Sequence, residues 1–143
     1  MRAPLPPKTR RGRLPQGGAS VKTILIADDE AHLRLLVRKT LTEDGQRLLE
    51  AADGQEALAR ARKERPDLVI LDWMMPRMTG LEVLEALRAD PDTKHARVIM
   101  LTARSQQFDR TLVHRLGVSG YLVKPFSPLE LIQLVERVLE GES

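Results

Sequence analysis

The most regular feature of the sequence is a series of short apolar runs that end at polar residues. Four runs cover residues 23–27, 68–71, 98–101 and 121–123, and a weaker one covers residues 48–52. Runs of this length are typical of strands buried on both faces of a sheet, although each alone also fits a short buried helix. Because longer segments of another pattern separate them evenly, we interpret them as five strands, with 48–52 at an edge.

The segments between these runs repeat their apolar residues with the period of an α-helix. Several expected helix ends are marked by glycine or proline, namely Gly54, Pro66, Gly80, Pro91 and Gly117. The last helix is expected to begin at Pro128, after Ser127 as its N-cap. The apolar faces expected to pack on the sheet are Leu33, Leu36, Val37 and Thr40; Leu58 and Ala61; Val83, Leu84 and Leu87; Phe108, Leu112, Val113 and Leu116; and Leu131, Leu134, Val135 and Val138.

Five alternating strand and helix segments predict a parallel sheet. Each crossover between strands is expected to be right-handed, which places helices on both faces of the sheet. The expected fold class is therefore α/β, with a five-stranded parallel sheet in the flavodoxin-like strand order 2-1-3-4-5. In such a sheet, ligands bind beyond the carboxyl ends of the strands, where the strand order reverses.

Charge and composition divide the chain into two parts. Five of its 23 lysines and arginines, and none of its 20 acidic residues, lie within residues 1–20, which also hold four prolines and three glycines. We expect a flexible basic tail rich in proline and glycine over residues 1–21, which is either inert or a weak arm for an anionic partner, and one folded domain over residues 22–140. Cysteine is absent, which excludes disulfides and thiolate metal sites. No apolar run has membrane-spanning length, so we expect a cytoplasmic protein.

Polar residues cluster just past the carboxyl ends of the apolar runs. They are Asp28, Asp29, Asp72, Thr102 and Lys124. In the predicted sheet these ends line one edge, so residues far apart in the sequence meet in one cleft. Three carboxylates repel one another in a low dielectric unless a cation lies between them, and oxygen ligands favour Mg²⁺ or Mn²⁺. With a hydroxyl and an ammonium group beside them, the set fits phosphoryl transfer to a carboxylate.

Each of these acids alone has a simpler explanation. An aspartate at the end of a strand is more often the cap of the next helix than a catalytic group. The three consecutive acids at residues 28–30 are also weak evidence when taken alone. The interpretation therefore depends on the conjunction of five residues at five matching positions, and not on any single motif.

Beyond these spacings, the sequence resembles the receiver domains of two-component response regulators. The segments that carry the resemblance are Ile24–Glu30 (ILIADDE), Leu68–Gly80 (LVILDWMMPRMTG), Leu101–Ala103 (LTA) and Gly120–Ser127 (GYLVKPFS). The resemblance extends from about Lys22 to Glu140. It implies a signalling domain, not an enzyme with its own substrate: such a domain accepts a phosphoryl group from a phosphohistidine and promotes only its own phosphorylation and dephosphorylation.

The resemblance implies particular roles for the acidic residues. Asp72 would be the phosphoacceptor. Asp29 and Asp72 would bind Mg²⁺ directly, and Asp28 would do so through water. The main-chain carbonyl of Met74 would supply a further ligand, and Mn²⁺ would serve in place of Mg²⁺.

A second set of implied roles concerns a conformational switch. Thr102 would hydrogen-bond one phosphoryl oxygen, and Lys124 would pair with another. The ring of Tyr121 would turn inward as Thr102 moves toward the phosphoryl group. Phosphorylation would bias two conformations through contacts that differ between them. The pair Lys124–Pro125 matches a cis peptide bond of the family.

Further residues are expected to act around this site. Met74 is two residues past Asp72, and Arg104 is two residues past Thr102. Both would tune the lifetime of the aspartyl phosphate. We expect slow to moderate self-dephosphorylation. Leu35 is expected on the exposed face of the first helix, either as a lone exposed leucine or as a contact for a kinase or phosphotransferase. Ile132 and Leu139 widen the apolar face of the last helix, either as packing at the core edge or as an output surface.

The sequence departs from transcription-factor receivers in two places. Ser119 and Gly120 stand where many of those receivers carry two acidic residues, and Leu134 stands where they place a basic one. These departures remove charges that such receivers use for dimerisation. We therefore expect a monomer or a weak, phosphorylation-dependent dimer.

These expectations combine into one function. The chain is interpreted as a single-domain response regulator that takes a phosphoryl group from a histidine kinase or histidine phosphotransferase and signals to a downstream protein without binding a membrane. The first alternative is a receiver fragment of a longer regulator. An aspartate-nucleophile phosphatase is a weaker alternative, because Met74 lies where such enzymes carry an acidic proton donor. Nucleic-acid binding is expected only weakly, through the basic tail.

Overall fold

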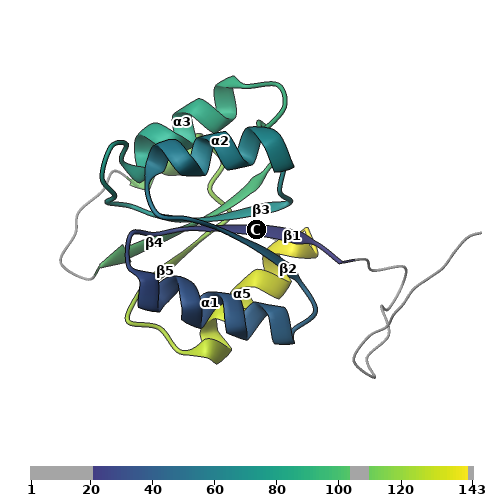
Figure 1. The fold of residues 1–143 in the computed structure, drawn as a ribbon. Coiled ribbons are helices and arrows are strands. Elements are labelled where there is room, and N and C mark those ends of the chain that lie inside the picture. Colours follow the sequence, from purple (N-terminus) through teal and green to yellow (C-terminus); the bar gives the residue numbers. More distant parts are fainter. Residues whose placement is uncertain (1–20, 104–109, 142–143) are drawn as a thin grey trace, which may run out of the picture.

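The centre of the molecule is a parallel sheet of five strands. The computed structural model describes residues 21–103 and 110–141, so residues 1–20 of the predicted tail lie outside it. The strand order is β2-β1-β3-β4-β5, which confirms the order predicted from the sequence. The strands are β1 (Thr23–Ala27), β2 (Arg47–Ala51), β3 (Leu68–Asp72), β4 (Arg97–Ala103) and β5 (Gly120–Lys124). Figure 1 shows this sheet between two layers of helices.

Burial along the strands explains why the runs are apolar without alternation. Every residue of β3 is buried, and so are residues 24–27 of β1 and 98–102 of β4. Side chains of successive strand residues point to opposite faces, so complete burial requires a cover on both faces. β2 lies at the edge of the sheet, as predicted, and of its five residues only Leu49 and Ala51 are buried.

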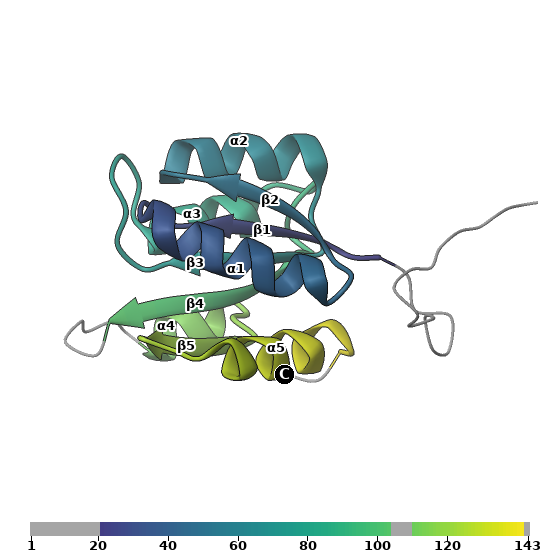
Figure 2. The same cartoon turned by 60° about the horizontal axis from the view of Figure 1, so that its bottom comes forward.

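Five helices provide that cover. They are α1 (Ala31–Glu43), α2 (Gly54–Glu64), α3 (Gly80–Ala89), α4 (Arg110–Arg115) and α5 (Pro128–Leu139). One apolar core joins α2, α3 and α4 to the first face of the sheet, and a second core joins α1 and α5 to the other face. Figure 2 turns the α1–α5 layer toward the viewer. No helix in the described ranges is long and apolar enough to cross a membrane.

Local signals in the sequence fix several of these helix ends. Ser127 caps α5, because its hydroxyl accepts a hydrogen bond from the Glu130 main-chain N–H while the Glu130 carboxylate accepts one from Ser127 N–H. Thr79 and Glu82 form the same reciprocal pair at the start of α3. Such pairs satisfy main-chain donors that the first helical turn leaves free. The predicted start of α5 at Pro128 is confirmed.

The predicted core face of α1 is wrong at one position. Leu36 was expected to pack on the sheet, but it is 38% exposed, and the buried residues of the helix are Val37 and Leu41. At about 100° per residue, Leu36 lies about 120° from the midpoint between those two residues. The helix is therefore rotated relative to the expected face. Phe108, expected on the core face of the fourth helix, lies outside the described residues.

Candidate functional site

The carboxyl ends of four neighbouring strands bring the predicted polar residues to one edge of the sheet. Asp28 and Asp29 directly follow β1, and Asp72 is the last residue of β3. Thr102 is the penultimate residue of β4, and Lys124 is the last residue of β5. Since β1, β3, β4 and β5 are consecutive in the sheet, these five residues meet although they are distant in the sequence.

Three carboxylates form a compact group at this edge. One oxygen from each of Asp28, Asp29 and Asp72 lies within 4.8 Å of the others. Asp28 and Asp72 are buried, whereas Asp29 is exposed. Asp28 Oδ1 accepts a hydrogen bond of 2.8 Å from the main-chain N–H of Glu30, which fixes the direction of the Asp28 carboxylate. The group is thus open to solvent on the Asp29 side and enclosed on the other.

Lys124 faces this group from β5. Its Nζ lies 2.8 Å from Asp28 Oδ2, 3.4 Å from Asp72 Oδ1 and 3.3 Å from Glu30 Oε1. The shortest of these contacts is an ion pair with the buried Asp28 carboxylate, and it favours the charged forms of both groups. Sequence reasoning missed Glu30 as a partner of Lys124, although its place in the same turn as Asp28 could have suggested it.

The effect of burial on the pKa values of Asp28 and Asp72 is larger than the opposing effect of Lys124. Desolvation raises the pKa of Asp28, even though Lys124 and the Glu30 N–H favour its charged form. Desolvation, together with the charge of Asp28, raises the pKa of Asp72 from 3.8 to about 6. Burial by itself would lower the pKa of Lys124, but its contacts with the carboxylates outweigh burial and raise it. At neutral pH this edge therefore holds negative charge that one ammonium does not balance.

The donor set fits a hard divalent cation. Carboxylate oxygens are the ligands that Mg²⁺ and Mn²⁺ prefer in proteins. Asp28 Oδ2 is a buried oxygen whose contact among the described residues is the ion pair with Lys124, and a carboxylate oxygen can accept more than one partner. A cation between Asp28, Asp29 and Asp72 would add a partner for that oxygen and relieve the repulsion that, after burial, raises the pKa of Asp72.

The chain after Asp72 folds back tightly on the end of β3. Trp73 N–H donates to the Leu101 carbonyl at 2.8 Å, and Gly80 N–H donates to the Trp73 carbonyl at 2.8 Å. A β-carbon on Gly80 would collide with the Asp72 carbonyl, so this position requires glycine. The main-chain N–H of Met74 donates to the Asp72 carboxylate, and the Met74 side chain is half exposed. Sequence reasoning recognised Gly80 only as the start of a helix.

The two predicted switch residues lie on adjacent strands. Thr102 is buried, and its hydroxyl donates to the Ala103 carbonyl at 3.2 Å. Tyr121 is partly buried against the core beneath α2, α3 and α4. The guanidinium carbon of Arg110 lies 5.5 Å from the centre of the Tyr121 ring, a cation–π contact. Arg104, predicted to tune the lifetime of a phosphoryl group, lies outside the described residues. The expected cis bond between residues 124 and 125 is present.

The three residues predicted as partner surfaces differ in exposure. Leu35 is 51% exposed on α1, which confirms its expected place on the solvent face. Ile132 and Leu139 are partly buried against the core formed by α1 and α5. This partial burial fits packing at the core edge, and it also leaves part of each side chain exposed for an output surface.

The two departures from transcription-factor receivers meet in the structure. A β-carbon on Gly120 would lie 2.9 Å from Leu134 Cδ1, so the Leu134 side chain fills the space beside this glycine. Leu134 itself is buried in the core between α5 and the sheet. These positions therefore provide packing between β5 and α5 in place of surface charge.

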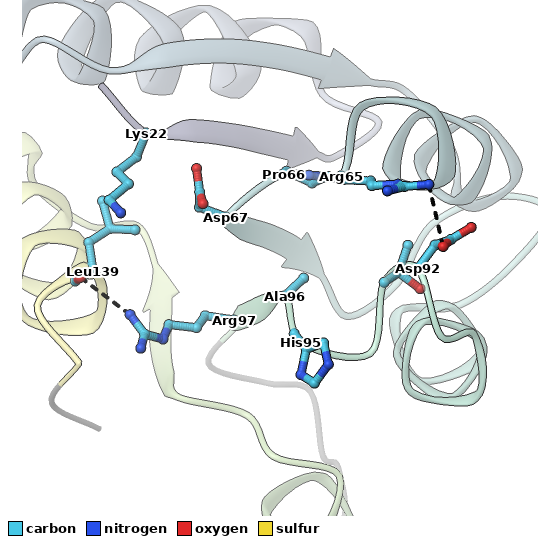
Figure 3. Close-up of a pocket in the computed structure, with 10 residues that line it drawn as sticks. Lys22, Arg65, Pro66, Asp67, Asp92, His95, Ala96, Arg97 and Leu139 are labelled. Atoms are coloured by element: carbon cyan, nitrogen blue, oxygen red, sulfur yellow. Dashed lines mark hydrogen bonds and ion pairs between the residues drawn. The ribbon is translucent and has the colours of Figure 1, made fainter. Parts of the chain in front are cut away.

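A hollow of about 360 Å³ lies at the opposite, amino-terminal edge of the sheet. Figure 3 shows Lys22, Asp67 and Arg97 around it, with Arg65 paired to Asp92 at 3.4 Å. Several of its charged groups already bond to the fold: Asp67 accepts the Thr23 N–H at 2.9 Å, and Arg97 donates to the last carbonyls of α5. The acid cluster, in which two buried carboxylates share one ammonium group, is the better candidate for chemistry.

Comparison with known proteins agrees with this geometry. The family described as response regulator receiver domain matches residues 24–136. The alkaline phosphatase synthesis transcriptional regulatory protein PhoP of Bacillus subtilis is 40% identical over 118 residues, covering 82% of this chain and 48% of PhoP. The phosphate regulon transcriptional regulatory protein PhoB of Pseudomonas aeruginosa is also 40% identical over 118 residues, covering 82% of this chain and 52% of PhoB.

Solved structures give the same result. The chemotaxis response regulator CheY4 of Vibrio cholerae superposes with a TM-score of 0.77 and 38% identity, covering 83% of this chain and 99% of CheY4. The chain spans about half the length of the curated relatives that it matches. The family match extends over most of the chain and includes every strand that carries a site residue. The chain therefore belongs to the family of response regulator receiver domains, which are signalling domains of two-component systems.

Proposed function

We propose that the unit formed by residues 22–140 accepts a phosphoryl group on Asp72 and transmits a signal through protein contacts. The observation that carries this proposal is the position of the Asp72 carboxylate. It lies at the end of β3, within 4.8 Å of the oxygens of two other aspartates and 3.4 Å from Lys124 Nζ. With a pKa of about 6, Asp72 is ionised at neutral pH and available as a nucleophile.

In the proposed reaction, one Asp72 oxygen attacks the phosphorus of a phosphohistidine on a partner protein. The new P–O bond forms as the P–N bond to the imidazole breaks, and the leaving imidazole nitrogen takes up a proton. Lys124 pairs with one phosphoryl oxygen. Mg²⁺, or Mn²⁺ in its place, held by Asp28, Asp29, Asp72 and the Met74 carbonyl, would neutralise charge on the phosphoryl group.

The proposed signal begins at the Thr102 hydroxyl. This hydroxyl is bonded only to the adjacent carbonyl of Ala103 among the described residues, at the long distance of 3.2 Å, so exchanging that bond for a charged phosphoryl oxygen is favourable. Movement of Thr102 would change the packing beside Tyr121 on the adjacent strand. The two states then differ in a contact that only phosphorylation provides, as a population shift requires.

The proposed partners follow from the same chemistry. A histidine kinase or histidine phosphotransferase in the cytoplasm would supply the phosphoryl group, with Leu35 on α1 as one contact. Ile132 and Leu139 would contribute to an output surface at the edge of α5 for a downstream protein. Met74 at the mouth of the site, together with Arg104, would set the lifetime of the aspartyl phosphate.

Two settings for this receiver have specific support. The match to CheY4 covers 99% of that protein, which favours a receiver that acts as a single domain. The matches to PhoP and PhoB are to proteins named as transcriptional regulators, which favours the receiver part of such a regulator. The contact between Gly120 and Leu134, which replaces the charges used in transcription-factor dimers, supports the first setting and a monomer or weak dimer.

The proposal is tested by incubating the protein with acetyl phosphate and recording its intact mass. We expect the mass of one phosphoryl group to be added when Mg²⁺ is present and not when EDTA replaces it. Asp72→Asn should take up none. Uptake by the Asp72→Asn protein, or equal uptake in EDTA, would contradict the assignment of Asp72 and of the cation.

A further inference from the structure

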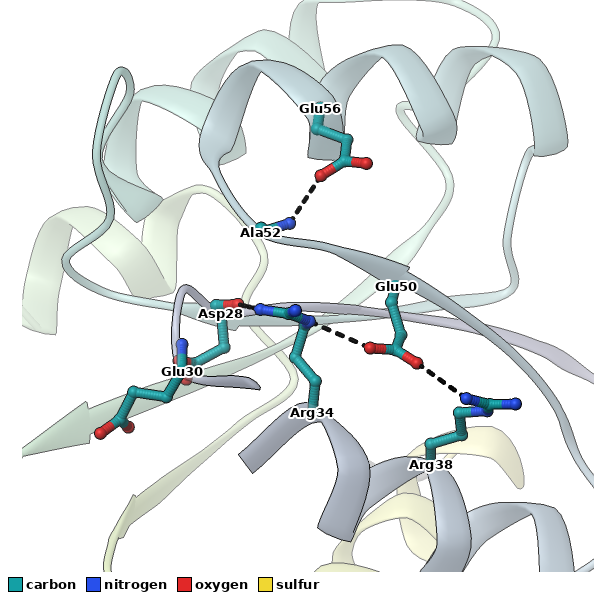
Figure 4. Close-up of polar contacts among 7 residues, drawn as sticks. All are labelled: Asp28, Glu30, Arg34, Arg38, Glu50, Ala52 and Glu56. Atoms are coloured by element: carbon teal, nitrogen blue, oxygen red, sulfur yellow. Dashed lines mark hydrogen bonds and ion pairs between the residues drawn. The ribbon is translucent and has the colours of Figure 1, made fainter. Parts of the chain in front are cut away.

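A partly buried arginine, Arg34, joins the turn that carries two of the acids to the edge strand β2. Arg34 on α1 donates from Nη1 to the main-chain carbonyl of Asp28 at 2.8 Å and from Nε to Glu50 Oε1 on β2 at 3.0 Å. Its side chain is only 18% exposed. Figure 4 shows the guanidinium group between Asp28 and Glu50, with Arg38 on the other side of Glu50. This contact lies outside the set of residues that would touch a phosphoryl group.

The carbonyl that Arg34 holds belongs to the peptide unit between Asp28 and Asp29. Rotation of that unit would change the direction in which the Asp29 side chain leaves the backbone. No hydrogen bond or ion pair within the described ranges holds the Asp29 carboxylate itself. Its place beside Asp28 and Asp72 therefore depends on the backbone of the turn.

We infer that Arg34, braced by Glu50, is a positioning residue for the cation site: it fixes the Asp28 carbonyl and thereby directs the Asp29 carboxylate toward Asp28 and Asp72. This inference rests on the proposed function, because it assumes that the three acids bind a divalent cation. Residues that orient metal ligands without touching the metal commonly change metal affinity by 10- to 100-fold. We therefore expect a substantial loss of Mg²⁺ affinity when Arg34 is replaced.

The charge of Arg34 predicts the opposite effect, which makes the inference testable. A positive charge near a cation site repels the cation, so its removal by Arg34→Met would tighten Mg²⁺ binding if electrostatics were its only influence. Arg38 provides a matched control, because it also pairs with Glu50, at 3.3 Å. Within the described part of the chain, Arg38 makes no hydrogen bond to Asp28. Only the positioning role predicts weaker binding for Arg34→Met and not for Arg38→Met.

The experiment is a Mg²⁺ titration of the full chain, followed by the fluorescence of Trp73, the only tryptophan. We expect Arg34→Met to raise the Mg²⁺ dissociation constant by about tenfold, and Arg38→Met to change it by less than about twofold. Arg34→Lys keeps the charge but cannot hold both oxygens in the same fork, so it should also weaken binding. If Arg34→Met fails to fold in EDTA, Arg34→Lys alone decides the result.

A second readout needs no metal. In EDTA, amide hydrogen exchange in the turn at residues 28–30 should be faster in Arg34→Met than in Arg38→Met. Mg²⁺ affinity and exchange rates that match the wild type in both Arg34 variants would overturn the inference while leaving the proposed cation site intact. A wild-type protein that binds no Mg²⁺ would overturn both.

Discussion

Charged residues gather at both edges of the central sheet, but they are compensated differently. At the amino-terminal edge, Asp67 accepts a main-chain N–H of β1, and Arg97 donates to the final carbonyls of α5. At the carboxyl edge, Lys124 faces two buried carboxylates and Glu30 at once. Desolvation there raises the pKa values of both buried aspartates.

The difference separates charges that support the fold from charges that are available for chemistry. The amino-terminal groups complete hydrogen bonds that strand and helix ends leave open. The carboxyl-edge acids Asp28, Asp72 and Glu30 instead share the single ammonium group of Lys124. A buried arrangement of this kind is destabilising without a ligand, and strongly perturbed pKa values of this type cluster at functional sites.

The largest expected difference between the edges is in phosphorylation. Asp72→Asn should abolish uptake of a phosphoryl group, because an amide is not a nucleophile for this reaction. Asp67→Asn, at the other edge, should leave uptake unchanged, since an amide oxygen can still accept the Thr23 N–H. Intact mass after treatment with acetyl phosphate and Mg²⁺ measures both. Equal loss in the two variants would show that the edges are not distinct.

Removal of Lys124 should have the largest effect on stability. Lys124→Met leaves Asp28 and Asp72 buried without their cation, which should lower the free energy of unfolding in EDTA by about 2–4 kcal/mol. Arg65→Met breaks an exposed pair at the other edge and should cost at most about 0.5 kcal/mol. Urea unfolding at pH 8 compares the two. Similar losses for both variants would argue that the carboxyl-edge charges are ordinary surface charges.

Neutralising Asp72 should have the opposite effect to removal of Lys124: it should raise the free energy of unfolding. Its pKa in the folded protein is about 6, against 3.8 ordinarily, so the folded state binds the proton more tightly than the unfolded state. Its ionisation therefore lowers stability as pH rises from about 4 to about 6, and this penalty is complete above that window. At pH 8 in EDTA, Asp72→Asn should be more stable than wild type by roughly 1–3 kcal/mol.

The gain should become small near pH 4, where Asp72 is protonated in the folded state and close to half protonated in the unfolded state. Chemical denaturation of both proteins at pH 4, 6 and 8 measures this difference directly. Mg²⁺ should stabilise the wild type more at pH 8 than at pH 5, because protons compete for the same oxygens. A difference between variant and wild type that does not change with pH would contradict the raised pKa.

The smallest expected change in stability is at the amino-terminal edge, and it arises from the backbone conformation of Arg65. Arg65 ends α2 in a left-handed conformation, with φ of 49°. Glycine adopts this conformation without a steric penalty. Arg65→Gly should therefore raise stability by about 0.5 kcal/mol despite losing the pair with Asp92, whereas Arg65→Lys should change it little. Thermal unfolding would detect the shift, and destabilisation by Arg65→Gly would show that the charge matters more than the backbone.

Much of this account could be predicted from the sequence. Uninterrupted apolar runs identified the strands, and the residues that follow them identified the carboxyl edge, because topology alone brings strand ends together. Glycine and proline signals also placed the helix ends. These features depend on local pattern and on general rules of chain connection.

Other features depend on how side chains meet, which spacing does not reveal. The rotation of α1 that exposes Leu36 follows from how its neighbours pack. The bonds from Arg34 to Glu50 and to the Asp28 carbonyl join α1 to β2 and to the turn after β1. The need for glycine at position 80 arises from the close approach of the Asp72 carbonyl. None of these contacts follows from hydrophobic periodicity, and the motif that ends at Gly80 does not show which atom the glycine approaches.

The central claim is that the carboxyl edge is a cation-dependent phosphoacceptor site. The most direct test follows Trp73 fluorescence while Mg²⁺ and then beryllofluoride, a mimic of the phosphoryl group, are added to wild type and to Asp72→Asn. The account predicts a response to beryllofluoride that requires Mg²⁺ and is absent in Asp72→Asn. A response that persists in Asp72→Asn or without Mg²⁺, or no response in the wild type, would contradict it.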